Sequence, residues 1–412
     1  MTACAIETAA EDDDRDRDAA WSAGPGGPPG FADSAGPAGP PGFAGSAGFT
    51  ITANGAYAAR LAGAGDALYV ERWTLDGPEP YAVPLPLGQP EEPHAQLLPL
   101  ADGRVLVARR VDGRRNTFSL LYPTGPATGE LQLGAVEAPG SERLVLLPPS
   151  PDGICAYAMC VGPDTTTLWL VAGGAFGPEQ VAEIKGGCTG GVWLDRTGRI
   201  LALDRRLGDG PVKAVTVDLE RGGEVTPLLQ IAEESNDRLL LADPDSGLLL
   251  IRSDAPSPGR DRLGWGVLGS LLPVRFPECL RLDDAAVTPF AVQPGQVLMP
   301  ESCSVALRID AAGGSWVGTW EPSSRRMAQS AAPAGWLAGA GLWTAGGVLR
   351  LPYVTAGAPC GLVELETPPE PEPEPEPVAS TAAVPAAVVD EPRVCRPVPL
   401  QQAPLTDRKP AG

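Results

Sequence analysis

Histidine and lysine are almost missing from this sequence, with His94 and three lysines (Lys185, Lys213 and Lys409) among 412 residues. A histidine-dependent catalytic triad would need His94, which lies in the loop-like stretch 91–94, so we expect a surface residue there and no catalytic base. The usual zinc ligand sets are nearly excluded as well, because the eight cysteines are scattered without a Cys-x-x-Cys pair. We expect buried, reduced thiols, no metal site and no cofactor.

Two nucleotide and hydrolase signatures are also lacking. No lysine follows a glycine, so there is no P-loop, and no Gly-x-Ser-x-Gly nucleophile turn occurs. Residues 243–247, Asp-Pro-Asp-Ser-Gly, resemble the start of a calcium loop, but the distal Glu is missing and the same residues make a good hairpin turn. We therefore expect a turn at this position.

Long apolar runs are absent, and one sign of charge dominates. The nearest candidate for a membrane span, Val378–Val389, is short and broken by Pro385. Residues 1–10 have no basic lead and are followed by the acidic run 11–14, so we expect no signal peptide and a cytoplasmic protein. The net charge of −20 disfavours nucleic acid and anionic membrane as partners. A basic or neutral protein is the expected partner of a monomeric chain.

What the sequence does contain is a repeated hairpin. Residues 187–206 show it best: an apolar run ends at Leu194, a turn follows at 195–198, and a second apolar run starts at Ile200. The same pattern recurs at steps of 38, 50, 45, 49, 48 and 52 residues, with turn glycines Gly65, Gly103, Gly153, Gly198, Gly247, Gly295 and Gly347. Further apolar runs between the hairpins give about four strands per repeat.

Many of these runs are apolar at consecutive positions, as in Leu248–Ile251, which is typical of strands that are buried on both faces. Repeats of 40–50 residues with four strands each predict an all-β protein, a single β-propeller over residues 48–366. Seven blades follow from the seven hairpins, with six or eight left open. The tryptophans lie mostly in strand-like runs, and we expect them to pack between blades.

The run Ser150-Pro151-Asp152-Gly153, followed by an apolar strand and then Leu168–Val171, resembles the SPDG repeat of TolB-like and WD40-like β-propellers. The resemblance covers one blade well and the other six loosely. It implies a propeller fold; the Gly-His and Trp-Asp signature of true WD40 repeats is absent, and a role in envelope complexes is not carried over.

Both ends of the chain have a low-complexity composition. Residues 1–47 are acidic and then rich in Gly and Pro in a collagen-like pattern, and residues 367–412 begin with a Pro-Glu tract; we expect both to be disordered tails. A short docking peptide at residues 392–400 is an alternative for the basic end. The last repeat offers three strands, so we predict that Phe49–Thr52 pairs with Gly361–Leu365 and closes the ring.

Binding without catalysis is the expected function, because the architecture of a binding or scaffold propeller is present and recognisable catalytic motifs are missing. If the strand that enters each hairpin is innermost, the longer loops share one face, where we expect the partner, with Arg114 and Arg115 as anchors. The candidate residues on this face are His94, Arg110, Asp112, Arg114, Arg115, Asn116, Arg143, Glu233, Glu234, Asp237 and Arg238. The alternative is a propeller enzyme of the lactonase, hydrolase or lyase type with a divalent cation at the channel mouth, since scattered ligands leave no linear motif.

Overall fold

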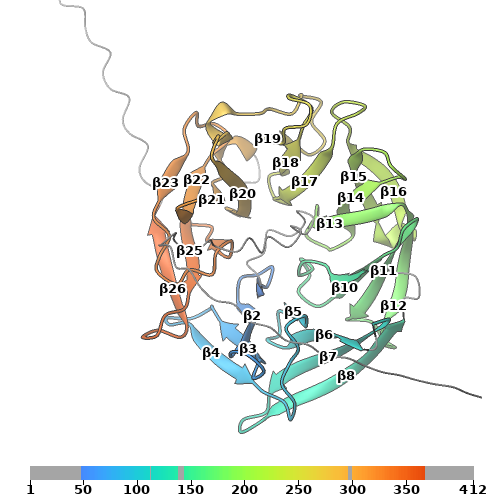
Figure 1. The fold of residues 1–412 in the computed structure, drawn as a ribbon, viewed down its shortest axis with the longest axis vertical. Coiled ribbons are helices and arrows are strands. Elements are labelled where there is room, and N and C mark those ends of the chain that lie inside the picture. Colours follow the sequence, from blue (N-terminus) through green and yellow to red (C-terminus); the bar gives the residue numbers. More distant parts are fainter. Residues whose placement is uncertain (1–47, 112, 138–142, 296–298, 367–412) are drawn as a thin grey trace, which may run out of the picture. The chain divides into compact units, whose positions relative to one another are not determined.

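The computed structural model describes residues 48–366, with the exception of residues 112, 138–142 and 296–298. In this part of the chain, 26 β-strands form seven antiparallel sheets that stand around a ring (Figure 1). Each sheet is one blade and is built from a continuous stretch of sequence. The expected all-β fold, a propeller with seven blades, is therefore confirmed. Both proposed tails lie outside the described residues.

The strands of the first four blades have the following bounds: β1 (Phe49–Ile51), β2 (Tyr57–Ala62), β3 (Tyr69–Thr74), β4 (Tyr81–Leu85); β5 (Gln96–Pro99), β6 (Val105–Val111), β7 (Arg115–Pro123), β8 (Thr128–Glu137); β9 (Arg143–Leu146), β10 (Ala156–Val161), β11 (Thr165–Ala172), β12 (Glu179–Lys185); β13 (Gly187–Trp193), β14 (Ile200–Arg206), β15 (Val212–Asp218), β16 (Glu224–Leu229). Blades 5 to 7 contain β17 (Asp237–Ala242), β18 (Leu248–Ser253), β19 (Arg262–Val267); β20 (Ala285–Val292), β21 (Val305–Ala311), β22 (Gly314–Trp320), β23 (Ala328–Ser330); β24 (Leu342–Trp343), β25 (Val348–Tyr353), β26 (Gly361–Glu366). Three short 3-10 helices are also described: η1 (Leu219–Arg221), η2 (Glu278–Leu280) and η3 (Pro300–Ser302).

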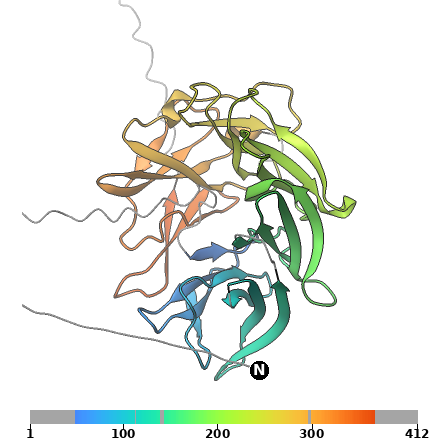
Figure 2. The ribbon, with the colours of Figure 1, turned by 45° about the vertical axis from the view of Figure 1, so that its right-hand side comes forward.

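The first strand of a blade lies near the centre of the ring and the last strand at its rim. In Figure 1, β5, β13 and β20 are central, whereas β8, β16 and β23 are peripheral; the turned view in Figure 2 shows the twisted sheets standing side by side. In an antiparallel sheet of this order, the turns after the first and third strands share one face. The loops after the second strand and the connections between blades share the other face, which we call the loop face.

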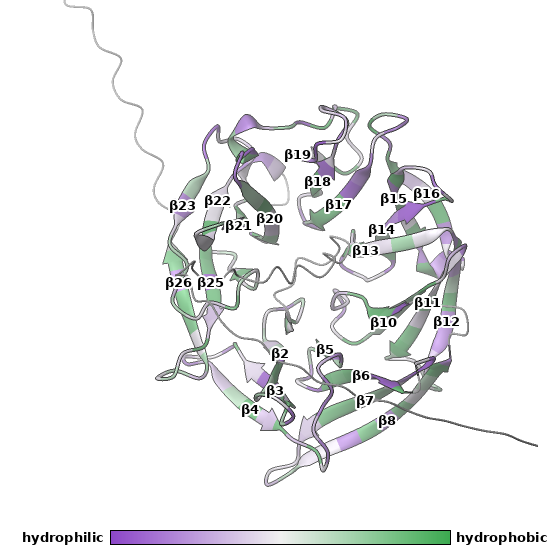
Figure 3. Ribbon diagram, viewed as in Figure 1, coloured by the Kyte–Doolittle hydropathy of each residue, from purple (hydrophilic) through white to green (hydrophobic). Residues whose placement is uncertain are grey.

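The core is divided into seven hydrophobic clusters, one at each interface between neighbouring blades. Strand β6 shows how the sequence produces this arrangement: Val105 and Val107 pack against blade 1, while Leu106 and Ala108 pack against blade 3. Successive side chains of a strand point to opposite faces, so a continuous apolar run can serve two neighbours at once. The hydrophobic colour in Figure 3 accordingly follows the strands, and hydrophilic colour gathers at the loops and on parts of the outermost strands.

The tryptophans occupy these interfaces, as expected. Trp73, Trp193, Trp320 and Trp343 are all buried, and each belongs to a different interface cluster. The six described cysteines are free thiols, and burial raises the pKa of Cys160 and Cys188 to about 11. Cys160, Cys188 and Cys303 are buried, which fits the role of small apolar core residues, whereas Cys155, Cys279 and Cys360 are half-buried.

The first hairpin of the ring is not the one that the sequence pattern indicated. The turn at Gly65 joins β2 to β3, whereas the inner hairpin of blade 1 joins β1 to β2 through Gly55, which has a φ of 71°. Measured from Gly55, the step to Gly103 is 48 residues, in line with the other repeats. Both turns are short, contain glycine and separate apolar runs, so local sequence could not tell an inner hairpin from an outer one.

The repeat pattern at Gly295 predicts that the second strand of blade 6 follows this turn directly, over Gln296–Met299. Residues 296–298 lie outside the described residues, but Met299 belongs to no strand and immediately precedes η3. The second strand of blade 6 is instead β21, which begins at Val305. The second strand of blade 6 therefore begins ten residues after Gly295, later than the sequence pattern indicates.

Closure of the ring by the N-terminal strand is not what the described residues show. Phe49–Ile51 pairs with β2, as Phe49↔Arg60 to Ile51↔Ala58, and β26 pairs with β25. Blades 7 and 1 meet instead through a cluster that contains Phe49, Trp73 and Ala340, with Leu362 packed against it. The rings of Phe49 and Trp73 contact edge to face, with centroids 5.0 Å apart. The predicted spare strand was in fact the innermost strand of blade 1.

Candidate functional site

The predicted site residues divide into two groups, both at the loop-face ends of blades. One group lies on blades 1 to 3, in the β4–β5 connection, around the β6–β7 turn and at the start of β9: His94, Arg110, Arg114, Arg115, Asn116 and Arg143. The other group lies at the β16–β17 connection, between blades 4 and 5: Glu233, Glu234, Asp237 and Arg238. Asp112 lies outside the described residues.

The group on blades 1 to 3 is mostly exposed. Arg110 folds back over its own turn and donates two hydrogen bonds to the carbonyl oxygen of Gly113, at 3.1 and 2.7 Å. Arg114 and Arg115 are exposed, as is His94. These side chains are free to meet a partner, but their exposure is also that of an ordinary solvated loop.

A cleft of about 510 Å³ lies on the loop face of blade 4. Its walls are the end of β14 with the loop that follows it and the start of the β16–β17 connection. We call it the blade 4 cleft, and its lining residues are Arg205, Leu207, Gly210, Pro211, Lys213, Gln230, Ile231, Ala232 and Glu233. Leu207 is 47% exposed, which leaves an aliphatic side chain open to solvent beside charged groups.

Two cations lie next to each other in this cleft. Arg205 of β14 and Lys213 of β15 are directly opposite residues in the antiparallel ladder, so their side chains leave the same face of the sheet. The Lys213 ammonium donates to Asp237 Oδ2 at 2.9 Å and to Ser235 Oγ at 3.3 Å, and also to the carbonyl oxygen of Ala232. Arg205 forms no ion pair with any described residue. The ion pairs of this region are formed by other cations, among them Arg199, Lys213 and Arg238.

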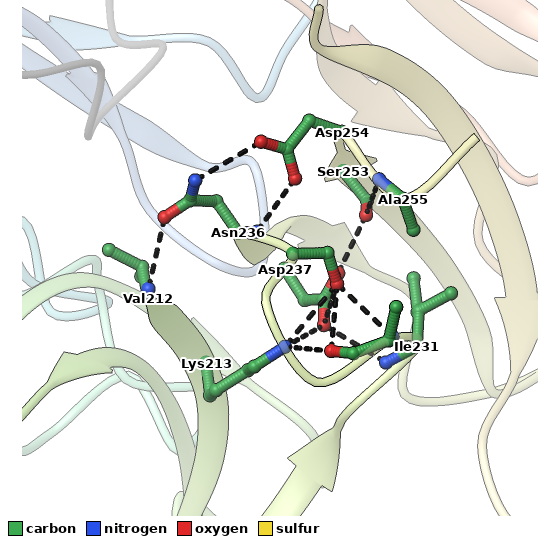
Figure 4. Close-up of polar contacts among 10 residues, drawn as sticks. Val212, Lys213, Ile231, Asn236, Asp237, Ser253, Asp254 and Ala255 are labelled. Carbon is green, nitrogen blue, oxygen red and sulfur yellow. Dashed lines mark hydrogen bonds and ion pairs between the residues drawn. The ribbon is translucent and has the colours of Figure 1, made fainter. Parts of the chain in front are cut away.

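Asp237 is the centre of the polar network beneath the cleft (Figure 4). Besides Lys213, its carboxylate accepts hydrogen bonds from Ser253 Oγ at 2.6 Å, from the Ile231 N–H at 2.9 Å and from Ser235 Oγ at 2.9 Å. The residue is completely buried. Four donors on three elements are thereby tied to one carboxylate, which fixes the floor of the cleft.

The β16–β17 connection is held from its other side by Asn236. Its amide oxygen accepts from the Val212 N–H at 3.0 Å, and Asp254 accepts from the Asn236 N–H at 2.7 Å (Figure 4). Burial alone would raise the pKa of Asp254, but the hydrogen bonds from Asn236, together with those from the Asp254 and Gly259 N–H groups, hold that pKa below its usual value. One wall of the cleft is therefore a preorganised loop.

Of the predicted residues in this region, only Glu233 lines the cleft, and Glu234 is exposed near it. Asp237 has no exposed surface, so the expectation that it meets a partner directly is corrected to a positioning role. Arg238 is also largely buried, with an ion pair of 3.7 Å to Asp204 and a hydrogen bond of 3.4 Å to Thr189 Oγ1. Burial raises the pKa of Asp204 to about 6, against the opposing effect of a hydrogen bond from the Leu239 N–H.

Sequence reasoning missed Arg205, Leu207, Lys213, Gln230 and Ile231, which line most of the cleft. Lys213 carried the strongest signal, because it is one of three lysines and interrupts an otherwise apolar strand run. A further pattern was overlooked: Gly264, Gly266 and Gly269 match Gly-x-Gly-x-x-Gly. It lies at the end of β19 and is followed by a loop, not by the helix that dinucleotide binding requires.

The described residues contain no group of three or more His, Cys, Asp and Glu side chains placed to hold a metal ion. At residues 243–247 they show the expected turn, in which Asp243 Oδ2 accepts hydrogen bonds from the Ser246 N–H and Oγ. Within the same part of the chain, no helix is long and apolar enough to cross a membrane.

The ring of seven four- or three-stranded sheets makes the described chain a seven-bladed β-propeller. No protein-family model matches the sequence, and no curated protein does. Among solved structures it is similar to a structure from a study of two prolyl endopeptidases, with 12% identity, a TM-score of 0.50, and coverage of 75% of this chain and 46% of that chain.

Two other similar structures are prolyl oligopeptidase B from Galerina marginata and TolB from Acinetobacter baumannii. The first has 11% identity, a TM-score of 0.49 and coverage of 77% of this chain and 48% of that chain. The second has 10% identity, a TM-score of 0.40 and coverage of 74% and 78%. This chain thus spans less than half the length of the peptidases it resembles. At these identities the likeness concerns the fold alone, and the TolB-like propeller expected from the SPDG repeat is in agreement with it.

Proposed function

We propose that this chain is a non-catalytic binding propeller that recognises a protein partner through its loop face, with the blade 4 cleft at the centre of the interface. The observation that carries the proposal is the cleft itself: about 510 Å³ with an exposed aliphatic rim and a charged floor. Protein interfaces likewise combine apolar contact area with a small number of polar and charged groups.

The rigidity of the cleft supports the same role. The Asp237 network and Asn236 hold the β16–β17 connection before any partner arrives, so little conformational entropy is lost on binding. Propellers offer such preorganised loops on a stable ring, and recognition commonly uses loops carried by a rigid framework.

The proposal is tested by affinity purification of the full chain from its own cells, comparing Leu207→Glu with Ile154→Glu. Both changes place a carboxylate at an exposed aliphatic position, but Ile154, 65% exposed, lies in the β9–β10 turn on the opposite face. We expect Leu207→Glu to weaken capture of the specific partner about tenfold or more, because the change removes an apolar contact and places a carboxylate that must lose its water when the partner binds. Ile154→Glu should capture it normally.

Arg114 and Arg115 on blade 2, the anchors predicted from the sequence, allow a result that would contradict the proposal. If Arg114→Glu with Arg115→Glu abolishes capture while Leu207→Glu does not, the interface belongs to the β6–β7 turn and the proposal for the cleft fails. Thermal unfolding of each variant separates a lost contact from a lost fold.

A further inference from the structure

The blade 4 cleft contains a cation without a counter-charge. Arg205 and Lys213 are opposite residues on β14 and β15, and like charges in this position destabilise a sheet. One carboxylate, Asp237, serves Lys213 at 2.9 Å. Among the described residues, no ion pair neutralises Arg205, whereas Lys213, the other cation that lines the cleft, is paired.

The surroundings of Arg205 restrict the kind of anion that would fit. Leu207, Pro211, Ile231 and Ala232 give the cleft apolar walls, and Gln230 adds a neutral polar group. The rim carries Glu233, and the chain as a whole has a net charge of −20. A polyanion such as a polyphosphate would be repelled by this field, whereas a single negative charge carried by an apolar group satisfies both the guanidinium and the walls.

We propose that the blade 4 cleft binds a single carboxylate flanked by an aliphatic side chain on a partner peptide, with Arg205 as the residue that pairs with the carboxylate. This inference rests on the proposed function and gives it a ligand chemistry. The guanidinium presents two parallel N–H donors to the carboxylate, and the aliphatic side chain packs against Leu207 and Ile231. The carboxylate can be the C terminus of the partner or an Asp or Glu side chain.

The test uses small probes on the full chain. N-acetyl-leucine, N-acetyl-leucinamide, N-acetyl-glutamate α-amide and inorganic pyrophosphate are titrated at constant ionic strength, and thermal unfolding is followed. We expect N-acetyl-leucine to raise the melting temperature measurably more than its amide does, because a ligand that binds only the folded state stabilises it. Stabilisation by the glutamate amide in place of N-acetyl-leucine would identify a side-chain carboxylate as the source.

Arg205→Met removes the cation but keeps most of the aliphatic stem, and Arg206→Met is its matched control. Arg206 is the next residue, is exposed and does not line the cleft. Both variants lose one positive charge, so a general electrostatic effect would act on both alike. Stabilisation by the carboxylate probe should be lost in Arg205→Met and retained in Arg206→Met.

Three results would overturn the inference: no stabilisation of the unaltered protein by either carboxylate probe, equal stabilisation of both variants, or stronger stabilisation by pyrophosphate. None of these results affects the proposed function, which depends on partner capture by the Leu207→Glu variant. If Leu207→Glu loses capture of the partner while neither carboxylate probe stabilises the unaltered protein, the cleft binds the partner through apolar contacts alone.

Discussion

At the scale of single residues, Asp237 explains why the blade 4 cleft keeps its shape. A fully buried carboxylate is costly unless it is paired and hydrogen-bonded. Asp237 meets this requirement with Lys213 and with hydrogen bonds from Ser235, Ser253 and the Ile231 N–H. The residue therefore stabilises the site without touching a partner.

Asp237→Ala should lower the free energy of unfolding by about 3–5 kcal/mol, the usual cost of removing one partner of a buried ion pair. Chemical denaturation measures this change. In a double-mutant cycle with Lys213→Met, the two substitutions together should cost less than the sum of the single ones, because the second removes a charge that the first had left unpaired. Strict additivity would mean that the two groups do not interact.

Asp204 predicts a pH dependence of stability. Its pKa is raised by burial from 3.8 to about 6 in the folded protein, so the folded state holds the proton more tightly than the unfolded state. The stabilising contribution of protonation is present below about pH 4 and is lost as the pH rises through 6. Asp204→Asn keeps an acceptor for the Leu239 N–H but cannot ionise.

The unfolding free energy of Asp204→Asn, relative to that of the unaltered protein, should therefore rise by up to about 3 kcal/mol between pH 4 and pH 7, since one pKa unit corresponds to about 1.36 kcal/mol. Comparing the two pH profiles cancels any constant cost of leaving Arg238 without its carboxylate. Parallel profiles over this range would show that Asp204 does not titrate as described.

At the scale of elements, β1 has two roles: it pairs with β2 inside blade 1, and it carries Phe49 into the cluster between blades 7 and 1. A chain that starts at residue 56 would lose both and expose the edge of β2. We expect its melting temperature to fall by several degrees or more, because burying one large aromatic side chain contributes about 1.5–3 kcal/mol before the lost strand pairing is counted. A chain that starts at residue 48 is the control, and equal melting temperatures for the two chains would show that β1 contributes little.

At the scale of the whole ring, the interface between blades 7 and 1 differs from the others. Polar contacts cross the first six interfaces: Gln96, for example, bridges the inner strands of blades 2 and 3 by donating to the Leu144 carbonyl oxygen and accepting from the Leu146 N–H. Gln293 likewise donates to the Ala345 carbonyl oxygen between blades 6 and 7. Among the described residues, the interface between blades 7 and 1 is formed by apolar packing around Trp73, so this part of the ring depends on side-chain fit more than the rest does.

Much of the fold could be predicted from the sequence because its main features are local. Hairpins with a turn glycine, such as the one at Gly198, set strand pairs through a few neighbouring residues, and double-sided apolar runs such as Leu248–Ile251 require neighbours on both faces. The repeat spacing then gave the number of blades. The prediction of individual strands failed in two places. The hairpins at Gly55 and Gly65 have similar sequences, and the second strand of blade 6 begins only at Val305, well after Gly295.

The sequence by itself determined the blades, their order and the face on which the longer loops lie, since these follow from periodicity and chain direction. Only the tertiary structure decided the site. Arg205 comes from the end of β14 and Leu207 from the loop after it, Ile231 and Glu233 come from the β16–β17 connection, and their approach depends on the Asp237 network. It also decided that the inner strand β1 stays within its own blade. Alternative pairings between distant segments have similar local sequence preferences. The packing of whole blades against one another determines which pairing forms.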